Sequence, residues 1–223
     1  ARRAGFDIRY ARSEDELPEP NFYILPSPLT DKYNAYSRRA FWRVIDKAKA
    51  GATVLITLGN GAILSGLEAE KVAGVKTENH FAANSALRLE GPDGAFAVPD
   101  SYTRQITCTS GEVVWRTTSG DAAMTVKNLG KGRVIFFNGA VEANAALTGW
   151  PVYAKAAELA GVKRRVRCAN RNVGLTEHPL PTGETVVVAI NYAPQSVTCA
   201  IEGAADGRVL RGVRKDGVWT IPA

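Results

Sequence analysis

The chain has 223 residues, of which 45% are hydrophobic and 22% are charged, and its formal net charge at pH 7 is +6. This length and composition allow a sizeable buried core in one large or two small globular domains. The sequence holds no apolar run near the roughly 20 residues that span a bilayer and no start typical of a signal peptide, so we expect a soluble protein without a membrane partner. It does not fix the compartment, although the cytoplasm is favoured.

The chain contains three cysteines and two histidines. Cys108, Cys168 and Cys199 are too few and too scattered for a disulfide framework, and no Cys-x-x-Cys pair suggests zinc. His80 and His178 stand far apart without a metal-type spacing. We therefore expect free, mostly buried thiols, no metal site and no cofactor.

A run of basic residues between positions 163 and 171 raises the question of nucleic acid. Its members are Lys163, Arg164, Arg165, Arg167 and Arg171. A nucleic-acid surface typically has aromatic side chains interleaved with the basic ones, and this run has none. A solvated or ion-paired basic face is the better interpretation, and no nucleic-acid partner is expected.

In chain order, Phe6–Tyr10 alternates apolar and polar side chains and predicts an edge strand. Phe22–Leu25 and Thr53–Leu58 are continuous apolar runs typical of strands buried on both faces. Between them an apolar stripe at helical spacing predicts a helix capped by Gly51. The stripe consists of Phe41, Val44, Ile45 and Ala48. This is the pattern of a right-handed βαβ crossover, so the domain is expected to be α/β with parallel strands.

The pattern changes after a short predicted helix at Leu67–Ala73. Between residues 87 and 127, short runs separated by turn residues predict a β insertion carried on the α/β layer. Val134–Asn138 is again wholly apolar and is expected to return to the parallel sheet. Trp150–Ala160 then predicts a helix, and its inward-facing residues are expected to be Val152, Ala156 and Leu159.

From Arg165 onward the pattern is all β and predicts a small antiparallel sandwich. The expected strands are Val166–Cys168, Val173–Glu177, Thr185–Ala193, Ser196–Ile201, Gly207–Leu210 and Val218–Ile221. We place the boundary near Gly161, giving domains at residues 1–161 and 162–223.

Two positions in the α/β domain are candidate binding residues. Asn60 lies in the turn Gly59–Gly66, at the carboxyl end of a predicted parallel strand, where α/β folds place their chemistry. The glycines there match neither the dinucleotide nor the phosphate-loop motif. Glu142 follows the last parallel strand and lies near Asn138; a glycosidase would need a second carboxylate across a pocket from it.

Trp115 and Trp219 are candidate carbohydrate-binding residues, because sugar rings stack on exposed aromatic faces. Both fall in predicted strands, where half-burial of a tryptophan is normal. A packing role is therefore the competing interpretation for each.

Five stretches together resemble a known family. They are Gly5–Tyr10, Phe22–Ser27, Ala50–Thr57, Gly130–Val134 and Asn191–Tyr192. In their order the chain resembles the non-catalytic C-terminal region of multidomain glycoside hydrolases, especially the trimerisation domain of family 42 type β-galactosidases followed by a small β domain. The resemblance implies a flavodoxin-like, doubly wound sheet similar to class I glutamine amidotransferases.

The resemblance also implies a lost activity. The amidotransferase nucleophile would be a cysteine at Gly59-Asn60-Gly61, yet the first cysteine of this chain is Cys108. The family's His-x-Glu pair is absent as well, so Cys-His catalysis is excluded.

We therefore expect an accessory and oligomerisation region of a glycoside hydrolase, itself without catalytic residues. Its expected partners are a catalytic barrel upstream in the same protein and further copies of the chain. The alternative is a carbohydrate-binding module that uses exposed tryptophans. Because a doubly wound sheet needs a central first strand, we also expect a further strand and helix before Ala1.

Overall fold

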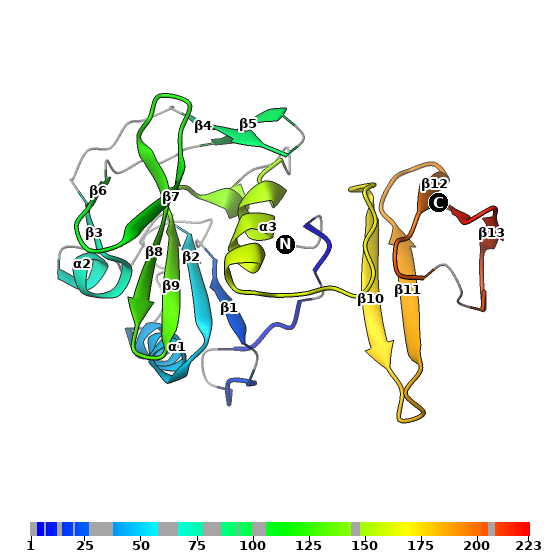
Figure 1. The fold of residues 1–223 in the computed structure, drawn as a ribbon, viewed down its shortest axis with the longest axis horizontal. Coiled ribbons are helices and arrows are strands. Elements are labelled where there is room, and N and C mark those ends of the chain that lie inside the picture. The colour runs from blue at the N-terminus through cyan, green and yellow to red at the C-terminus, as the bar shows by residue number, and fades with distance from the viewer. Residues whose placement is uncertain are drawn as a thin grey trace. The chain divides into compact units, whose positions relative to one another are not determined.

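The computed structural model describes residues 4–6, 8–12, 15–19, 21–26, 38–57, 67–77, 86–92, 94–99, 106–143, 148–204 and 208–223. The chain forms two compact units: Ala11–Val162, and Ala1–Tyr10 together with Lys163–Ala223. The regular structure is mostly β strand with few helices (Figure 1). No helix in these ranges is long and apolar enough to cross a membrane.

A five-stranded mixed sheet organises the larger unit (Figure 1). Its order is β1 (Phe22–Leu25), β2 (Thr53–Thr57), β9 (Gly132–Phe137), β8 (Ala122–Leu129) and β7 (Glu112–Arg116). β1, β2 and β9 are parallel neighbours, whereas β8 and β7 run antiparallel. The predicted βαβ crossover and the return of the third apolar strand to the parallel sheet are confirmed.

The predicted β insertion is corrected in one respect. β7 and β8 extend the main sheet, because a turn through Gly130, at φ +64°, folds β8 directly back onto β9. The remaining strands form two short pairs, β3 (Val75–Thr77) with β6 (Ile106–Cys108) and β4 (Ala86–Gly91) with β5 (Gly94–Pro99). Alternation of side chains is the same in a separate hairpin and at the antiparallel edge of a mixed sheet, so the sequence did not distinguish them.

The larger unit contains the helices α1 (Arg38–Ala50), α2 (Leu67–Ala73) and α3 (Trp150–Leu159) and a short 3₁₀ helix, η2 (Val141–Ala143). α1 and α2 pack against strands of the main sheet. The predicted stripe of α1 is buried throughout, and Gly51 has positive φ at its end. In α3 the buried face is rotated from the prediction: Tyr153 and Ala157 are buried, while Leu159 is only half-buried.

Both faces of β2 and of the apolar run of β9 are buried, whereas in β1 only the alternate residues Tyr23 and Leu25 are. On one face, Val54, Ile56 and Phe136 join the side chains of α1 in a single apolar cluster. Alternate residues point to the opposite face, and there Leu55 and Ile135 are also fully buried. Burial on both faces explains why these strands are continuous apolar runs rather than alternating ones.

Gly132 lies where β9 begins against the end of α1. A Cβ built there would lie 2.5 Å from the Ala48 carbonyl oxygen and closer still to that of Ala52. The backbone of Lys131 donates to the Lys49 carbonyl oxygen at 2.9 Å. The two-glycine turn thus joins β9 to the helix end by close backbone packing.

The smaller unit consists of two antiparallel sheets. β10 (Val173–Pro179) pairs with β11 (Thr185–Asn191), and β14 (Val218–Ile221) lies between β12 (Val197–Ala200) and β13 (Val213–Lys215). Its buried core consists of Val166, Val173, Leu175, Val197, Ile201 and Ile221.

Three predicted strands are absent from the described residues. Val166–Cys168 has only the isolated bridge between Arg167 and Glu202. Phe6–Tyr10 has no strand, and the Phe6 ring lies 6.0 Å from the Arg164 guanidinium, a tertiary contact that accounts for one apolar position of the alternating pattern. The described part of Gly207–Leu210 is also irregular, and Leu210 is exposed. β13 was missed because its three residues, Val-Arg-Lys, show no apolar alternation.

Candidate functional site

Polar side chains gather where the parallel strands end. Thr57 is the last residue of β2, and Asn138 follows the last residue of β9. Because neighbouring parallel strands end at the same edge of a sheet, these residues mark the edge where α/β folds place ligands. Asn60, the predicted binding residue after β2, lies outside the described residues.

Glu142 is the centre of this polar cluster. The Tyr153 hydroxyl donates to Glu142 Oε1 at 2.5 Å, and the Thr57 hydroxyl donates to Oε2 at 2.9 Å. Glu142 lies in η2, Tyr153 in the first half of α3 and Thr57 in β2, so the carboxylate joins three segments. We call Thr57, Glu142 and Tyr153 the Glu142 cluster.

The Glu142 cluster is shielded from solvent. Tyr153 and Thr57 are buried, at 9% and 3% exposure, and Glu142 is half-buried. Asn138 is 4% exposed, and its backbone N–H donates to the Ala123 carbonyl oxygen at 2.8 Å. A half-buried carboxylate that accepts a hydrogen bond on each oxygen is stabilised by two charge-assisted contacts. Such an arrangement suits a structural connection between strand and helix.

The sequence singled out Glu142 but missed both of its donors. Tyr153 stands beside the predicted inward residue Val152, and a tyrosine facing a helix core usually finds a partner for its hydroxyl. Thr57 ends a buried strand, where a hydroxyl needs a hydrogen bond. These signals indicate that each residue has a polar partner, but they do not say that the partner is Glu142.

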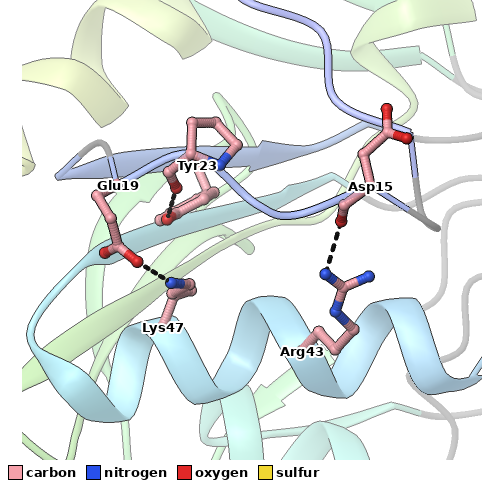
Figure 2. Close-up of polar contacts among 6 residues, drawn as sticks. Asp15, Glu19, Tyr23, Arg43 and Lys47 are labelled. Carbon is pink, nitrogen blue, oxygen red and sulfur yellow. Dashed lines mark hydrogen bonds and ion pairs between the residues drawn. The ribbon is translucent and has the colours of Figure 1, made fainter.

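A second polar network ties residues 15–19 to α1 (Figure 2). Arg43 Nη2 donates to the backbone carbonyl oxygen of Asp15 at 2.6 Å, and Lys47 forms an ion pair with Glu19. The Tyr23 hydroxyl donates at 2.5 Å to a carbonyl oxygen of the same segment. The acidic segment thus lies along the basic side of the helix.

Burial raises the pKa of Tyr23 above its usual value of 10.0; Lys47 nearby opposes this shift and Glu19 adds to it. The pKa of Lys47 is raised chiefly by its hydrogen bond to Glu19. Glu19 is largely exposed, so this ion pair contributes little to stability. The network positions residues 15–19 and offers no group poised for chemistry.

Trp115 packs against the β4–β5 pair. Its indole N–H donates to the Glu90 carbonyl oxygen at 3.2 Å, and its ring centroid lies 5.6 Å from that of Phe96. The side chain is half-buried. The contacts are those of a packing residue.

Trp219 is half-buried in β14, and the Arg214 guanidinium lies 5.5 Å from its ring centroid. Its indole nitrogen is buried and makes no hydrogen bond to the described residues. A sugar stacking on the face beneath Arg214 would have to displace that side chain.

No group of three or more metal-ligating side chains occurs among the described residues. His80 lies outside them, and His178 is exposed with its ring nitrogen 2.9 Å from the Thr176 hydroxyl. The basic residues at 164 and 165 have partners within their own unit: Arg164 pairs with Glu177, and Arg165 donates to the Thr185 hydroxyl.

No protein-family profile matches the sequence, and no curated protein matches it at a significant level. Solved structures do match. The cold-adapted β-galactosidase from Rahnella sp. R3 matches with a TM-score of 0.64 and 13% identity, over 100% of this chain and 34% of the enzyme. The β-galactosidase from Bacillus circulans sp. alkalophilus matches with a TM-score of 0.62 and 18% identity, over 95% of this chain and 33% of the enzyme.

A catalytic mutant of a glycoside hydrolase family 42 β-galactosidase from G. stearothermophilus matches with a TM-score of 0.53 and 15% identity, over 81% of this chain and 27% of the enzyme. The chain therefore spans about a third, or less, of the length of these β-galactosidases. The expected resemblance is confirmed in the fold, and it concerns a partial region of a glycoside hydrolase.

Proposed function

We propose that this chain is a non-catalytic accessory region of a glycoside hydrolase, which supports assembly of an enzyme whose catalytic barrel lies elsewhere. The observation that supports this proposal is coverage: the whole chain aligns with a third of a β-galactosidase. The Glu142 carboxylate already accepts hydrogen bonds from two hydroxyls. This arrangement suits a structural role in the region better than a catalytic one.

The finer fold assignment belongs to the same proposal. We assign the larger unit to the flavodoxin-like, class I glutamine amidotransferase-like type, on the support of three parallel strands with a buried crossover helix. The smaller unit is assigned to a small antiparallel sandwich, supported by two antiparallel sheets that share one core. The amidotransferase nucleophile has no counterpart, because Cys108 is the first cysteine in the sequence.

The test of the accessory role is an assay of the chain with aryl glycosides and with glutamine. We expect no turnover above the blank, and the same result for Glu142→Gln. Turnover by the original chain that disappears in Glu142→Gln would refute the proposal, because it would make the Glu142 cluster a catalytic site.

Assembly is the second part of the proposal. β11 exposes the apolar side chains of Val188 and Ile190, and Tyr192 just after the strand continues the alternation; each is at least 40% exposed. An apolar strand face of this kind is typical of a surface that another protein covers. We propose that the covering partner is another copy of the chain.

The mass of the chain in solution, measured by sedimentation across a range of concentrations, tests this second part. We expect more than one copy per particle, and a shift toward the monomer in Ile190→Lys. Thr198→Lys, an exposed change in β12, is the control and is expected to leave the mass unchanged. A monomer at every concentration would refute assembly through this chain while leaving the accessory role to be judged by the assay.

A further inference from the structure

Two cysteines that are distant in sequence meet in the smaller unit. Arg167 and Glu202 form a two-way backbone bridge, with N–H to carbonyl oxygen distances of 3.1 and 2.9 Å. Cys168 follows Arg167, and Cys199 lies three residues before Glu202, so this bridge brings the two cysteines into the same neighbourhood. Their side chains pack on the same core cluster, and Cys168 lies near enough to Cys199 to raise its pKa.

The backbone around the pair is held closely. Gly203 has φ +78°, and a Cβ built there would lie 3.1 Å from the carbonyl carbon of Arg165 and closer still to its oxygen. The segment before Cys168 therefore lies against the segment after β12 by backbone contact. Both cysteines are half-buried, which leaves part of each residue open to a small reagent.

We propose that Cys168 and Cys199 are a dithiol pair that forms a reversible intramolecular disulfide with a small-molecule disulfide as oxidant. The Cys168 thiolate attacks one sulfur of oxidised glutathione, so that a mixed disulfide forms and one glutathione thiolate leaves. The Cys199 thiolate then attacks Cys168 Sγ, the protein disulfide forms, and the second glutathione thiolate leaves. The two cysteines lose two electrons and two protons, and two molecules of reduced glutathione are formed.

The order of these steps follows from the surroundings of Cys199. Burial, followed by the hydrogen bond with Cys168, raises the pKa of Cys199 to about 12. Because the thiolate is the nucleophile, a thiol with so high a pKa reacts slowly at neutral pH. Closure by Cys199 is therefore the slow step, and its rate should rise about tenfold per pH unit between roughly pH 7 and pH 9.

The experiment uses the full chain carrying Cys108→Ser, which removes the one cysteine of the other unit. Cys108 is suited to this change because its thiol makes a local contact, 3.0 Å from the Gly111 carbonyl oxygen. The folded protein is incubated with oxidised glutathione, quenched by alkylation, weighed intact and digested with trypsin. Trypsin separates the two cysteines, because it cleaves after Arg167 and Arg171.

We expect a species lighter by two hydrogen atoms and a disulfide-linked pair of peptides that contain Cys168 and Cys199. Closure should be faster at pH 9 than at pH 7, and reduction should reverse it. The disulfide closes a loop of about 30 residues, so we expect it to raise the melting temperature by at least about 5 °C. In the same background, Cys199→Ser should stop at the glutathione adduct on Cys168.

Three results would overturn the proposal. Glutathione adducts on both cysteines without a linked peptide would show that the thiols cannot join in the folded unit. An equal rate of linkage in concentrated urea would show that the fold does not bring them together. Accumulation of an adduct on Cys199 in Cys168→Ser, at the rate seen for Cys168, would contradict the assigned order.

Discussion

Replacing Tyr153 by phenylalanine removes one hydroxyl from the Glu142 cluster and leaves the ring in place. The hydroxyl lies 2.5 Å from Glu142 Oε1, and the tyrosine is only 9% exposed. A hydrogen bond to a charged group contributes about 1.5–3 kcal/mol to the free energy of unfolding. We therefore expect Tyr153→Phe to destabilise the larger unit by about 1.5–3 kcal/mol, which is roughly 3–12 °C in melting temperature for a unit of this size.

Urea unfolding followed by far-ultraviolet circular dichroism measures the loss. Tyr10→Phe is the matched control, because it removes the same hydroxyl from a side chain that is 83% exposed, and it should change the free energy of unfolding by less than about 0.5 kcal/mol. Thr57→Val completes a double-mutant cycle on the other carboxylate oxygen. If Tyr153→Phe has no more effect than Tyr10→Phe, the Glu142 cluster does not hold β2 and α3 together as argued.

Gly132→Ala should destabilise the larger unit by about 3 kcal/mol or more, because its methyl group would overlap backbone atoms at the end of α1. Gly161→Ala is the comparison, because no atom lies within 4 Å of the added methyl group and only the positive φ of +69° is unfavourable; it should destabilise the unit by only about 1–2 kcal/mol in the same urea titration. Stability should fall as the pH rises above about 10, because the folded state raises the pKa of both Tyr23 and Lys47, and the stabilisation present at lower pH is lost as the folded groups deprotonate. Tyr23→Phe should flatten that fall, and an unchanged pH profile would contradict the assignment to Tyr23. Oligosaccharides should not quench tryptophan fluorescence saturably, and saturable quenching lost in Trp219→Ala would favour the carbohydrate-binding alternative.

The sequence predicted those elements whose own pattern decides their structure. The crossover predicted that β1 and β2 are parallel, and the wholly apolar run of β9 predicted its return to the parallel sheet, but the sequence did not predict that β9 pairs with β2. β7 and β8 were correctly predicted as strands, but not their membership of the main sheet. The sheet that a strand joins depends on the apolar surface against which the strand packs. That surface is formed by residues that are distant in sequence, so local alternation does not predict it.

Long-range polar contacts were harder to predict. The sequence predicts Glu142 as a candidate binding residue because it follows β9. The residues near Glu142 in the sequence do not indicate that Tyr153 and Thr57 are its hydrogen-bond partners. The same holds for Cys168 and Cys199, which spacing alone describes as scattered and which one backbone bridge brings together. Phe6–Tyr10 failed for the opposite reason, because a local alternation was outweighed by contacts such as that of Phe6 with Arg164.

The Glu142 cluster lies at the carboxyl edge of the parallel strands, and this position predicts how its loss would affect a complete glycoside hydrolase of the kind proposed above. The carboxyl edge of parallel strands is where α/β folds usually hold a ligand, because loops leave the sheet there and backbone groups are free. In this chain the carboxylate at that edge accepts hydrogen bonds from a strand and from a helix. A substitution that weakens these hydrogen bonds therefore weakens the attachment of α3 to the strand and leaves the reacting groups unchanged. In a complete glycoside hydrolase, Tyr153→Phe should therefore lower thermal stability, or the fraction assembled, while kcat of the assembled enzyme stays unchanged. A lower kcat at full assembly would instead place this edge in contact with the substrate.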